Sequence, residues 1–147
     1  MPPELLGTYF SAILCDFLRT RWLAERQTFT FETVMSHRGK LDFFLRARAQ
    51  GYRTYLYYIC TDSPLINEDR VRNRVVTGGH DVDSTKLIER YRRSLALLPD
   101  VVRSASRAYL FDNSAAAGHR LVAEGRLINA TESQPAWAIE SVLKDLT

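Results

Sequence analysis

An amphipathic helix is predicted at the start of the chain by the spacing of its apolar residues. Apolar side chains recur there every three or four positions, as one helical face requires: Leu5, Leu6, Tyr9, Phe10, Ile13, Leu14, Phe17 and Leu18. Arginines gather near the far end, where cations interact favourably with the helix dipole. The pattern predicts a helix from about Pro3 to Glu25.

Short strands then alternate with helices. β-Branched and aromatic residues predict a buried strand at 28–32 and a second strand at 53–60. Between them lies a helical stripe, closed by Gly51, of Leu41, Phe44, Leu45 and Ala49.

Capping residues mark two further helices. Ser63 is placed to cap a helix that begins at Pro64 and ends at Gly78-Gly79. Asp83 is placed to cap the next helix, whose apolar face carries Leu87, Tyr91, Leu95 and Leu98.

The last part of the sequence predicts a strand, a turn, a hairpin and a helix. The strand lies at 109–111 and the turn at 112–114. The hairpin pairs 119–124 with 127–130, and Pro135 opens the last helix.

The order of these elements indicates an α/β fold with a mostly parallel sheet. No internal repeat, low-complexity tract or linker interrupts it, so residues 1–147 are interpreted as one domain. In such sheets ligands bind beyond the carboxyl ends of the strands. The rule selects three places in this sequence: 32–37, 61–62 and 112–114.

The composition is that of a globular domain, with 147 residues of which 46% are apolar and 25% are charged. No run of about 18 apolar residues occurs, and no basic segment precedes an apolar stretch at the start. Neither membrane insertion nor secretion is indicated, and the expected location is the cytoplasm. The two cysteines, Cys15 and Cys60, lack disulfide or metal-ligand patterns and are expected to be buried thiols.

Positive charge is concentrated in the middle of the chain. The net charge is −1 over residues 1–37, +6 over 38–107 and −2 over 108–147, which together give the formal +3. A basic middle between nearly neutral ends favours a local anionic ligand over a general polyanion-binding surface. Binding to nucleic acid is not expected, because no nucleic-acid-binding motif accompanies the charge.

The basic middle contains arginines that helical geometry places on defined faces. Arg70 and Arg74 are four residues apart and share a face, whereas Arg72 points away from them. Arg90 lies at the edge of the next helix's apolar stripe, and a Gly-Gly-His turn joins the two helices. Two interpretations stand: a solvated basic face, or the mobile lid of a nucleotide-type kinase that brings arginine onto a transferred phosphoryl group.

Other polar residues lie at the predicted strand ends. Glu32 and Thr33 place a carboxylate and a hydroxyl at the ligand-bearing edge, unless Glu32 simply faces water. The turn at 112–114 has the ordinary composition of a turn. The three histidines, at 37, 80 and 119, are too dispersed for a zinc site, and no nucleophile elbow accompanies them for a Ser-His-Asp triad.

Taken in order, these segments resemble the zeta-toxin family. The matching segments are TFETVMSH at 30–37, GYR at 51–53, DSP at 62–64, RVRNRV at 70–75, GGHDV at 78–82, RY at 90–91 and DNS at 112–114. The ordered set spans most of the chain and is more specific than any single segment. Proteins of that family are similar to P-loop kinases, and the toxins phosphorylate UDP-N-acetylglucosamine with ATP and magnesium under the control of an antitoxin.

The resemblance implies a P-loop-kinase-like three-layer sandwich with a helical lid around 64–98. It implies that Glu32, Thr33 and His37 bind a nucleotide-sugar substrate, and that Asp112 and Asn113 lie on the nucleotide side. It also implies catalytic arginines that neutralise phosphate charge: Arg70, Arg74 and Arg90. The cofactors expected for a complete member are ATP and Mg²⁺, and the expected protein partner is an antitoxin.

The sequence departs from the family in two ways. No segment fits G-x-x-x-x-G-K-[ST], the loop whose amides cradle phosphates, so the first strand and phosphate loop are missing from 1–147. The position that weakly matches the family's general base is Glu4. The chain is interpreted either as part of a longer kinase or as a non-catalytic module that binds a nucleotide sugar or an antitoxin. A sheet without its central strand also leads us to expect a homodimer.

Overall fold

The structure is a computed structural model that describes residues 3–124, 127–128 and 134–142, with side chains over 10–124 and 134–142. The chain forms two units, Met1–Thr33 and Val34–Thr147. The single domain expected over 1–147 stays a prediction.

The first unit is built on α1 (Pro3–Ala24), as the apolar spacing predicts. Phe10 and Ile13 are each 67% exposed and Phe17 is 61% exposed, so this part of the stripe that predicts the helix is open to solvent. Cys15 is also exposed, so the prediction that it is a buried thiol is wrong.

The segment after α1 forms no strand, and the predicted strand at 28–32 is therefore wrong. Its aromatic rings pack locally instead. Phe29 lies 5.4 Å from Trp22 between ring centroids, and the Arg19 guanidinium lies 4.9 Å from the centroid of Phe31. β-Propensity reflects packing on a sheet, and no neighbouring strand pairs with this segment among the described residues.

The second unit contains a four-stranded sheet with the order β1-β2-β3-β4. Its strands are β1 (Tyr55–Cys60), β2 (Arg107–Asp112), β3 (Arg120–Glu124) and β4 (Leu127–Ile128). β1 and β2 are parallel in a register that pairs Tyr55 with Arg107 and Cys60 with Asp112. The β2–β3 and β3–β4 pairs are antiparallel, so the prediction of a mostly parallel sheet is wrong for the described strands.

The C-terminal hairpin is confirmed as the β3–β4 pair, which joins Ala123 to Ile128 and Glu124 to Leu127 in register. Its turn at 125–126 and the predicted continuation at 129–130 lie outside the described residues. The last helix, α5 (Ala136–Ser141), follows Pro135 as predicted.

The other three helices of this unit are α2 (Arg38–Ala49), α3 (Pro64–Val76) and α4 (Ser84–Ser104). Ser63 and Asp83 cap α3 and α4 as predicted, by accepting hydrogen bonds from the amides of Leu65 and Lys86. Gly78, at φ +89°, follows the end of α3.

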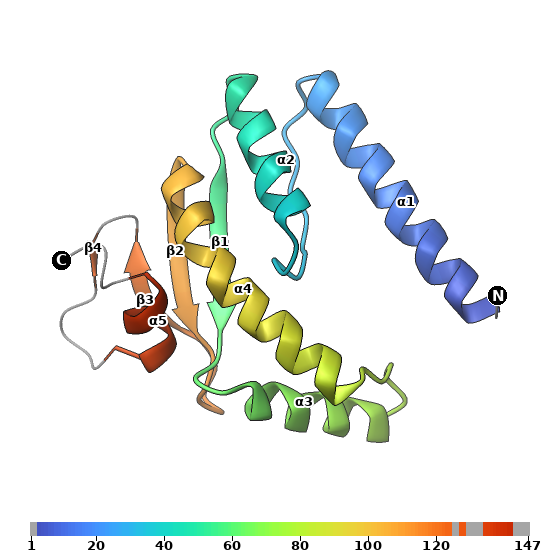
Figure 1. Ribbon diagram of the computed structural model, residues 1–147, viewed down its shortest axis with the longest axis vertical. Helices are drawn as coiled ribbons and strands as arrows, with labels where there is room; N and C mark the ends of the chain where they lie inside the picture. The colour runs from blue at the N-terminus through green and yellow to red at the C-terminus, as the bar shows by residue number, and fades with distance from the viewer. Residues whose placement is uncertain (1–2, 125–126, 129–133, 143–147) are drawn as a thin grey trace. The chain divides into compact units, whose positions relative to one another are not determined.

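The core lies between the sheet and α4, which crosses in front of β1 and β2 in Figure 1, with α5 in front of β3. Alternate strand residues supply it, including Leu56, Tyr58 and Leu110, and Leu98, Val101 and Trp137 come from the helices. The fold of the second unit is thus mixed α/β, with residues of α2, α4 and α5 packed on one face of the sheet. The three-layer sandwich of a P-loop kinase stays a prediction.

Candidate functional site

The candidate site lies at the carboxyl ends of β1 and β2. Because these strands are parallel and in register, Cys60 and Asp112 end side by side, and the loops that follow them meet. The amide of Asn113 donates to the carbonyl oxygen of Cys60 at 2.7 Å, which continues the pairing one residue beyond β2. Two of the three places selected from the sequence, 61–62 and 112–114, therefore come together.

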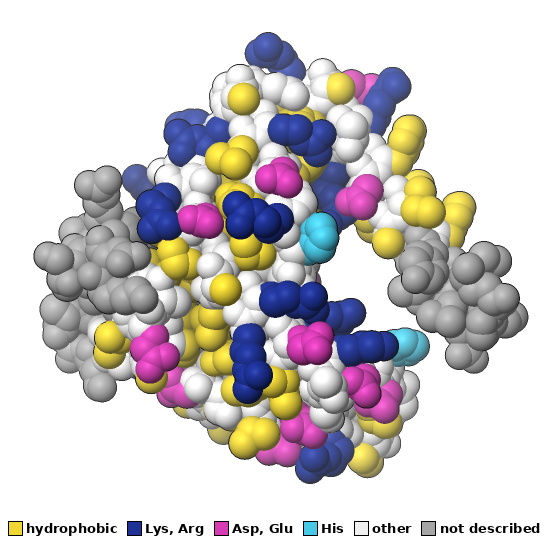
Figure 2. All heavy atoms as spheres, viewed as in Figure 1, with side chains coloured by type: hydrophobic (Ala, Val, Ile, Leu, Met, Phe, Trp, Pro, Cys, Tyr) yellow, Lys and Arg dark blue, Asp and Glu magenta, His cyan; other side chains and the backbone are white. Residues whose placement is uncertain are grey.

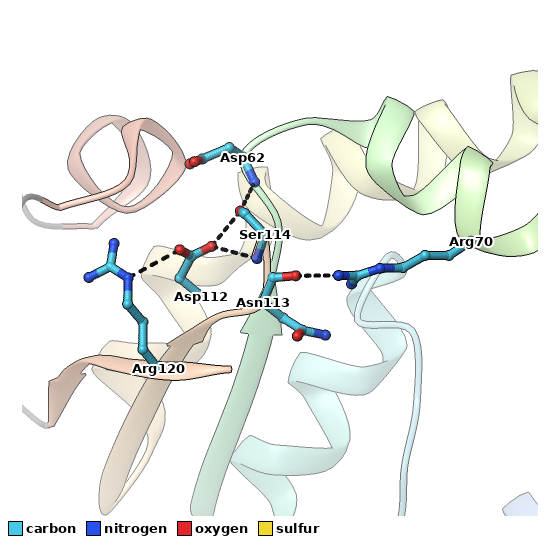
Figure 3. A network of polar contacts seen from close by, with 6 residues as sticks. All are labelled: Asp62, Arg70, Asp112, Asn113, Ser114 and Arg120. Atoms are coloured by element: carbon cyan, nitrogen blue, oxygen red, sulfur yellow. Dashed lines mark hydrogen bonds and ion pairs between the residues drawn. The ribbon is translucent and has the colours of Figure 1, made fainter. Parts of the chain in front are cut away.

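Asp112 is the centre of a polar network that joins the two loops (Figure 3). Its Oδ1 accepts a hydrogen bond from the Ser114 hydroxyl at 2.6 Å and another from the Ser114 amide at 3.1 Å. The Ser114 Oγ in turn accepts from the amide of Asp62 at 2.8 Å. One side chain thus closes its own Asx turn and, through Ser114, ties it to the loop after β1.

Arg120 balances the charge of this carboxylate. Its Nε lies 3.3 Å from Asp112 Oδ2, and the Asp112 side chain is only 8% exposed while that of Arg120 is 36% exposed. A buried carboxylate needs both a counter-charge and hydrogen-bond donors, and Asp112 has them. Both of its oxygens are therefore engaged within the protein.

Arg70 connects α3 to the same network. Its guanidinium donates to the carbonyl oxygen of Asn113 at 2.7 Å. In Figure 3 Arg70 reaches the turn from one side and Arg120 from the other, while the Asp62 carboxylate and the Asn113 amide group point away from Asp112. The groups at this edge that are free of the network are thus the Asp62 carboxylate and the Asn113 amide.

A second set of contacts fixes α4 against the end of β1. The Tyr91 hydroxyl donates to the carbonyl oxygen of Thr61 at 2.7 Å, and the Tyr58 and Ser94 hydroxyls lie 3.0 Å apart. Burial raises the pKa of the Cys60 thiol and of both tyrosine hydroxyls above their ordinary values. These groups stay protonated at neutral pH, so they act here as hydrogen-bonding and packing groups.

The predicted lid arginines do not act together in this structure. Arg74 donates to the carbonyl oxygen of His80 at 2.8 Å, and so closes the turn between α3 and α4. The Arg90 side chain is exposed on α4 and makes no hydrogen bond or ion pair with another described residue. Arg72 lies in solvent beside Glu68 and Asp69, as helical geometry predicts. Arg70 alone among the three predicted catalytic arginines contacts the candidate site.

The other predicted site residues have local surroundings of their own. His37 caps α2, and its Nδ1 accepts from the Gly39 amide at 3.1 Å. Glu32 and Thr33 are exposed in the first unit, on a segment that is not a strand. Glu4 is in the first turns of α1, and its side chain lies outside the described residues.

Sequence reasoning missed Arg120 and Ser114 as partners of Asp112. Ser114 had a local signal, because serine two residues after aspartate is common in Asx turns. Arg120 had none, since it reaches Asp112 through the antiparallel pairing of β2 with β3, in which these two residues are register partners.

Positive charge does not collect in one patch over the helices. Figure 2 shows Lys and Arg side chains spread over the face in view, with Asp and Glu side chains between them. The described residues contain no group of three or more His, Cys, Asp or Glu side chains placed to hold a metal ion. The arrangement is suited to holding two loops in fixed positions, and it leaves the Asp62 carboxylate and the Asn113 amide free to contact a polar ligand.

No protein-family model, curated protein or solved structure matches this chain. Within the described residues, no helix has the length and apolar character needed to cross a membrane.

Proposed function

We propose that this chain is the lid and acceptor portion of a zeta-toxin-like kinase, whose complete form phosphorylates a nucleotide sugar such as UDP-N-acetylglucosamine with ATP. The observation that carries the proposal is the α3–α4 helix pair, held by Arg70 at the carboxyl edge of the parallel β1–β2 pair. This edge is where α/β sheets bind ligands, and arginine is suited to the oxygens of phosphate.

In this proposal each predicted residue keeps the role that the resemblance implies. Arg70, Arg74 and Arg90 neutralise phosphate charge, and Glu32, Thr33 and His37 contact the acceptor. Asp112 and Asn113 organise the nucleotide side, and Glu4 takes the position of the base. An antitoxin would regulate the complete enzyme.

The residues present do not by themselves fit magnesium or a nucleotide triphosphate. The Asp112 carboxylate is hydrogen-bonded to Ser114 and paired with Arg120, and the described residues form no metal-ligand set. Phosphoryl transfer depends on positioning and charge neutralisation, for which kinases of this kind use a phosphate loop. The chain alone is therefore proposed to bind an acceptor and not to transfer phosphate.

Two measurements test this proposal with the same variants. Calorimetric titration with UDP-N-acetylglucosamine should give weak binding to the chain, weakened further by Arg90→Ala. Arg92→Ala is the matched control, because Arg92 is exposed on the same helix but points to another side. No binding, or equal loss in both variants, refutes an acceptor site at Arg90.

A phosphorylation assay with ATP and magnesium should show no transfer to the same sugar by the 147-residue chain. Magnesium-dependent transfer that Arg90→Ala abolishes and Arg92→Ala preserves would show instead that the chain is a complete kinase.

A second candidate function is a non-catalytic module that binds a nucleotide sugar or an antitoxin. The internal use of Asp112 and Arg74 favours it, since groups engaged within the protein are not free for catalysis. Tight binding to a protein encoded beside it, without any binding of nucleotide sugars, would support this candidate. Loss of sugar binding in Glu32→Ala but not in Glu89→Ala would favour the kinase-derived pocket instead.

A further inference from the structure

One face of the sheet in the second unit is apolar and exposed. Burial alternates along β1, where Tyr55, Tyr57 and Ile59 are 46%, 63% and 56% exposed. On the same face, Tyr109 and Phe111 of β2 are half-buried, and Leu121, the register partner of Phe111, is 38% exposed. We call these six residues the open sheet face.

The residue types on the open sheet face are those of a covered surface. A sheet with one face in water normally alternates apolar and polar residues, whereas a strand covered on both faces is apolar throughout. β1 has the sequence YLYYIC, which matches a strand covered on both faces. The core helices α4 and α5 pack against the opposite residues, including Leu56 and Leu110, so these helices leave the open sheet face uncovered.

The area of the open sheet face is in the range of a small protein interface. An aromatic side chain covers about 150–250 Å² when fully buried, so six large and partly exposed side chains offer roughly 500 Å² or more. Contiguous apolar patches of that size on a monomer mark interaction sites. With the residues around its rim, the face approaches the ~800 Å² per partner of a standard interface.

The chemistry of the open sheet face favours a second copy of the same chain. A two-fold interface places the same patch on both sides, so the patch must complement itself. At its rim Arg107 lies 3.7 Å from Glu124, so the face carries both signs and can pair reciprocally with its copy. A nucleic acid would require excess positive charge and free ring faces, but Tyr57 and Tyr109 stack on each other at 4.9 Å.

We propose that two copies of this chain associate face to face through the open sheet face. Two sheets pack in this way about 10 Å apart, with their strands roughly 30° from parallel. Tyr57 lies midway along β1 and stacks on Tyr109 of β2, and Arg107 and Glu124 form the charged part of the patch. The proposal is independent of the kinase proposal, because it uses neither the α3–α4 arginines nor the carboxyl edge of the strands.

Sedimentation velocity of the purified chain over a range of concentrations tests the proposal. The wild-type chain should sediment as a dimer that dissociates on dilution. Tyr57→Glu should weaken the dimer at least about 30-fold, because it buries a carboxylate within the interface twice. Circular dichroism and urea unfolding should show that the variant keeps its fold, since Tyr57 is exposed in the monomer.

Two matched variants make the result specific. Val76→Glu introduces the same charge at a residue that is 82% exposed on α3, and should leave the dimer intact. Phe17→Glu introduces it on the exposed stripe of α1, and should also leave the dimer intact. A monomer at every concentration, a dimer that Phe17→Glu alone disrupts, or a dimer that survives Tyr57→Glu through edge pairing of β1 would each overturn the proposal.

Discussion

Replacement of Asp112 by alanine should destabilise the second unit because this carboxylate holds two loops together. Its side chain is 8% exposed and accepts two hydrogen bonds from Ser114. Hydrogen bonds to a charged group contribute about 1.5–3 kcal/mol each at most, and their effects are not additive when the same residue donates both. The pair with Arg120 adds no more than about 1 kcal/mol, because Arg120 is 36% exposed and can be rehydrated.

We therefore expect Asp112→Ala to lower the free energy of unfolding by about 2–4 kcal/mol. Asp112→Asn should cost only about 1 kcal/mol, because an amide oxygen can still accept from Ser114 while the charge is lost. Ser114→Ala should cost about 1 kcal/mol, since the amide of Asp62 loses its acceptor but Asp62 is exposed enough to find water.

Urea unfolding followed by circular dichroism at pH 7 measures all three variants. The midpoint should shift while the dependence on denaturant stays constant, as for a change in stability alone. If Asp112→Ala costs less than about 0.5 kcal/mol, the network does not join the loops as described. If Asp112→Asn costs as much as Asp112→Ala, charge rather than the Asx turn is the main contribution.

Two further predictions concern the pH dependence of stability and the space around Gly79. Because the pKa of Cys60 and those of Tyr58 and Tyr91 are raised, the folded state keeps protons that the unfolded state releases at high pH. The free energy of unfolding should therefore be constant to about pH 8.5 and fall above the ordinary thiol pKa of 9.0. The fall should be up to about 1.4 kcal/mol per pH unit for each group. Thermal unfolding from pH 7 to 10.5 measures this effect. The stability of Cys60→Ala, relative to its own value at pH 7, should begin to fall at a higher pH than that of the wild type. A stability that rises with pH contradicts the prediction. Gly79→Ala should cost about 1–3 kcal/mol, because a Cβ there would lie 2.9 Å from the Arg74 carbonyl oxygen and closer still to Arg74 Cγ. Its cost should be smaller in an Arg74→Ala background, and an equal cost in both backgrounds would show that the Arg74 side chain plays no part.

Much of the local structure could be predicted from the sequence. Helical periodicity and caps located α1, α3 and α4, because each depends on residues within one or two turns of each other. The face occupied by Arg72 followed from helical spacing in the same way. Turn composition likewise placed a turn at 112–114, where the structure has the Asx turn of Asp112.

The wrongly predicted strand at 28–32 shows where the local sequence pattern fails to predict structure. Its residues have high β-propensity, but a strand also needs a neighbour to pair its backbone groups. The same limit applies to strand direction: alternation of strands and helices predicted a mostly parallel sheet, and only β1–β2 is parallel among the described strands. The sequence between β2 and β3 is too short for a crossover helix, which parallel pairing requires.

Some features of the candidate site follow from the sequence alone, and others depend on the tertiary structure. The sequence by itself determined that polar residues follow β1 and β2, and that Arg70 and Arg74 share one helical face. Only the tertiary structure decided what those side chains do: Arg70 reaches Asn113 across 43 positions of sequence, whereas Arg74 turns back to His80. Arg120 joins Asp112 only through the β2–β3 pairing. Helix faces and caps are set by near neighbours in the chain, while the partner of a long side chain depends on which elements pack beside it.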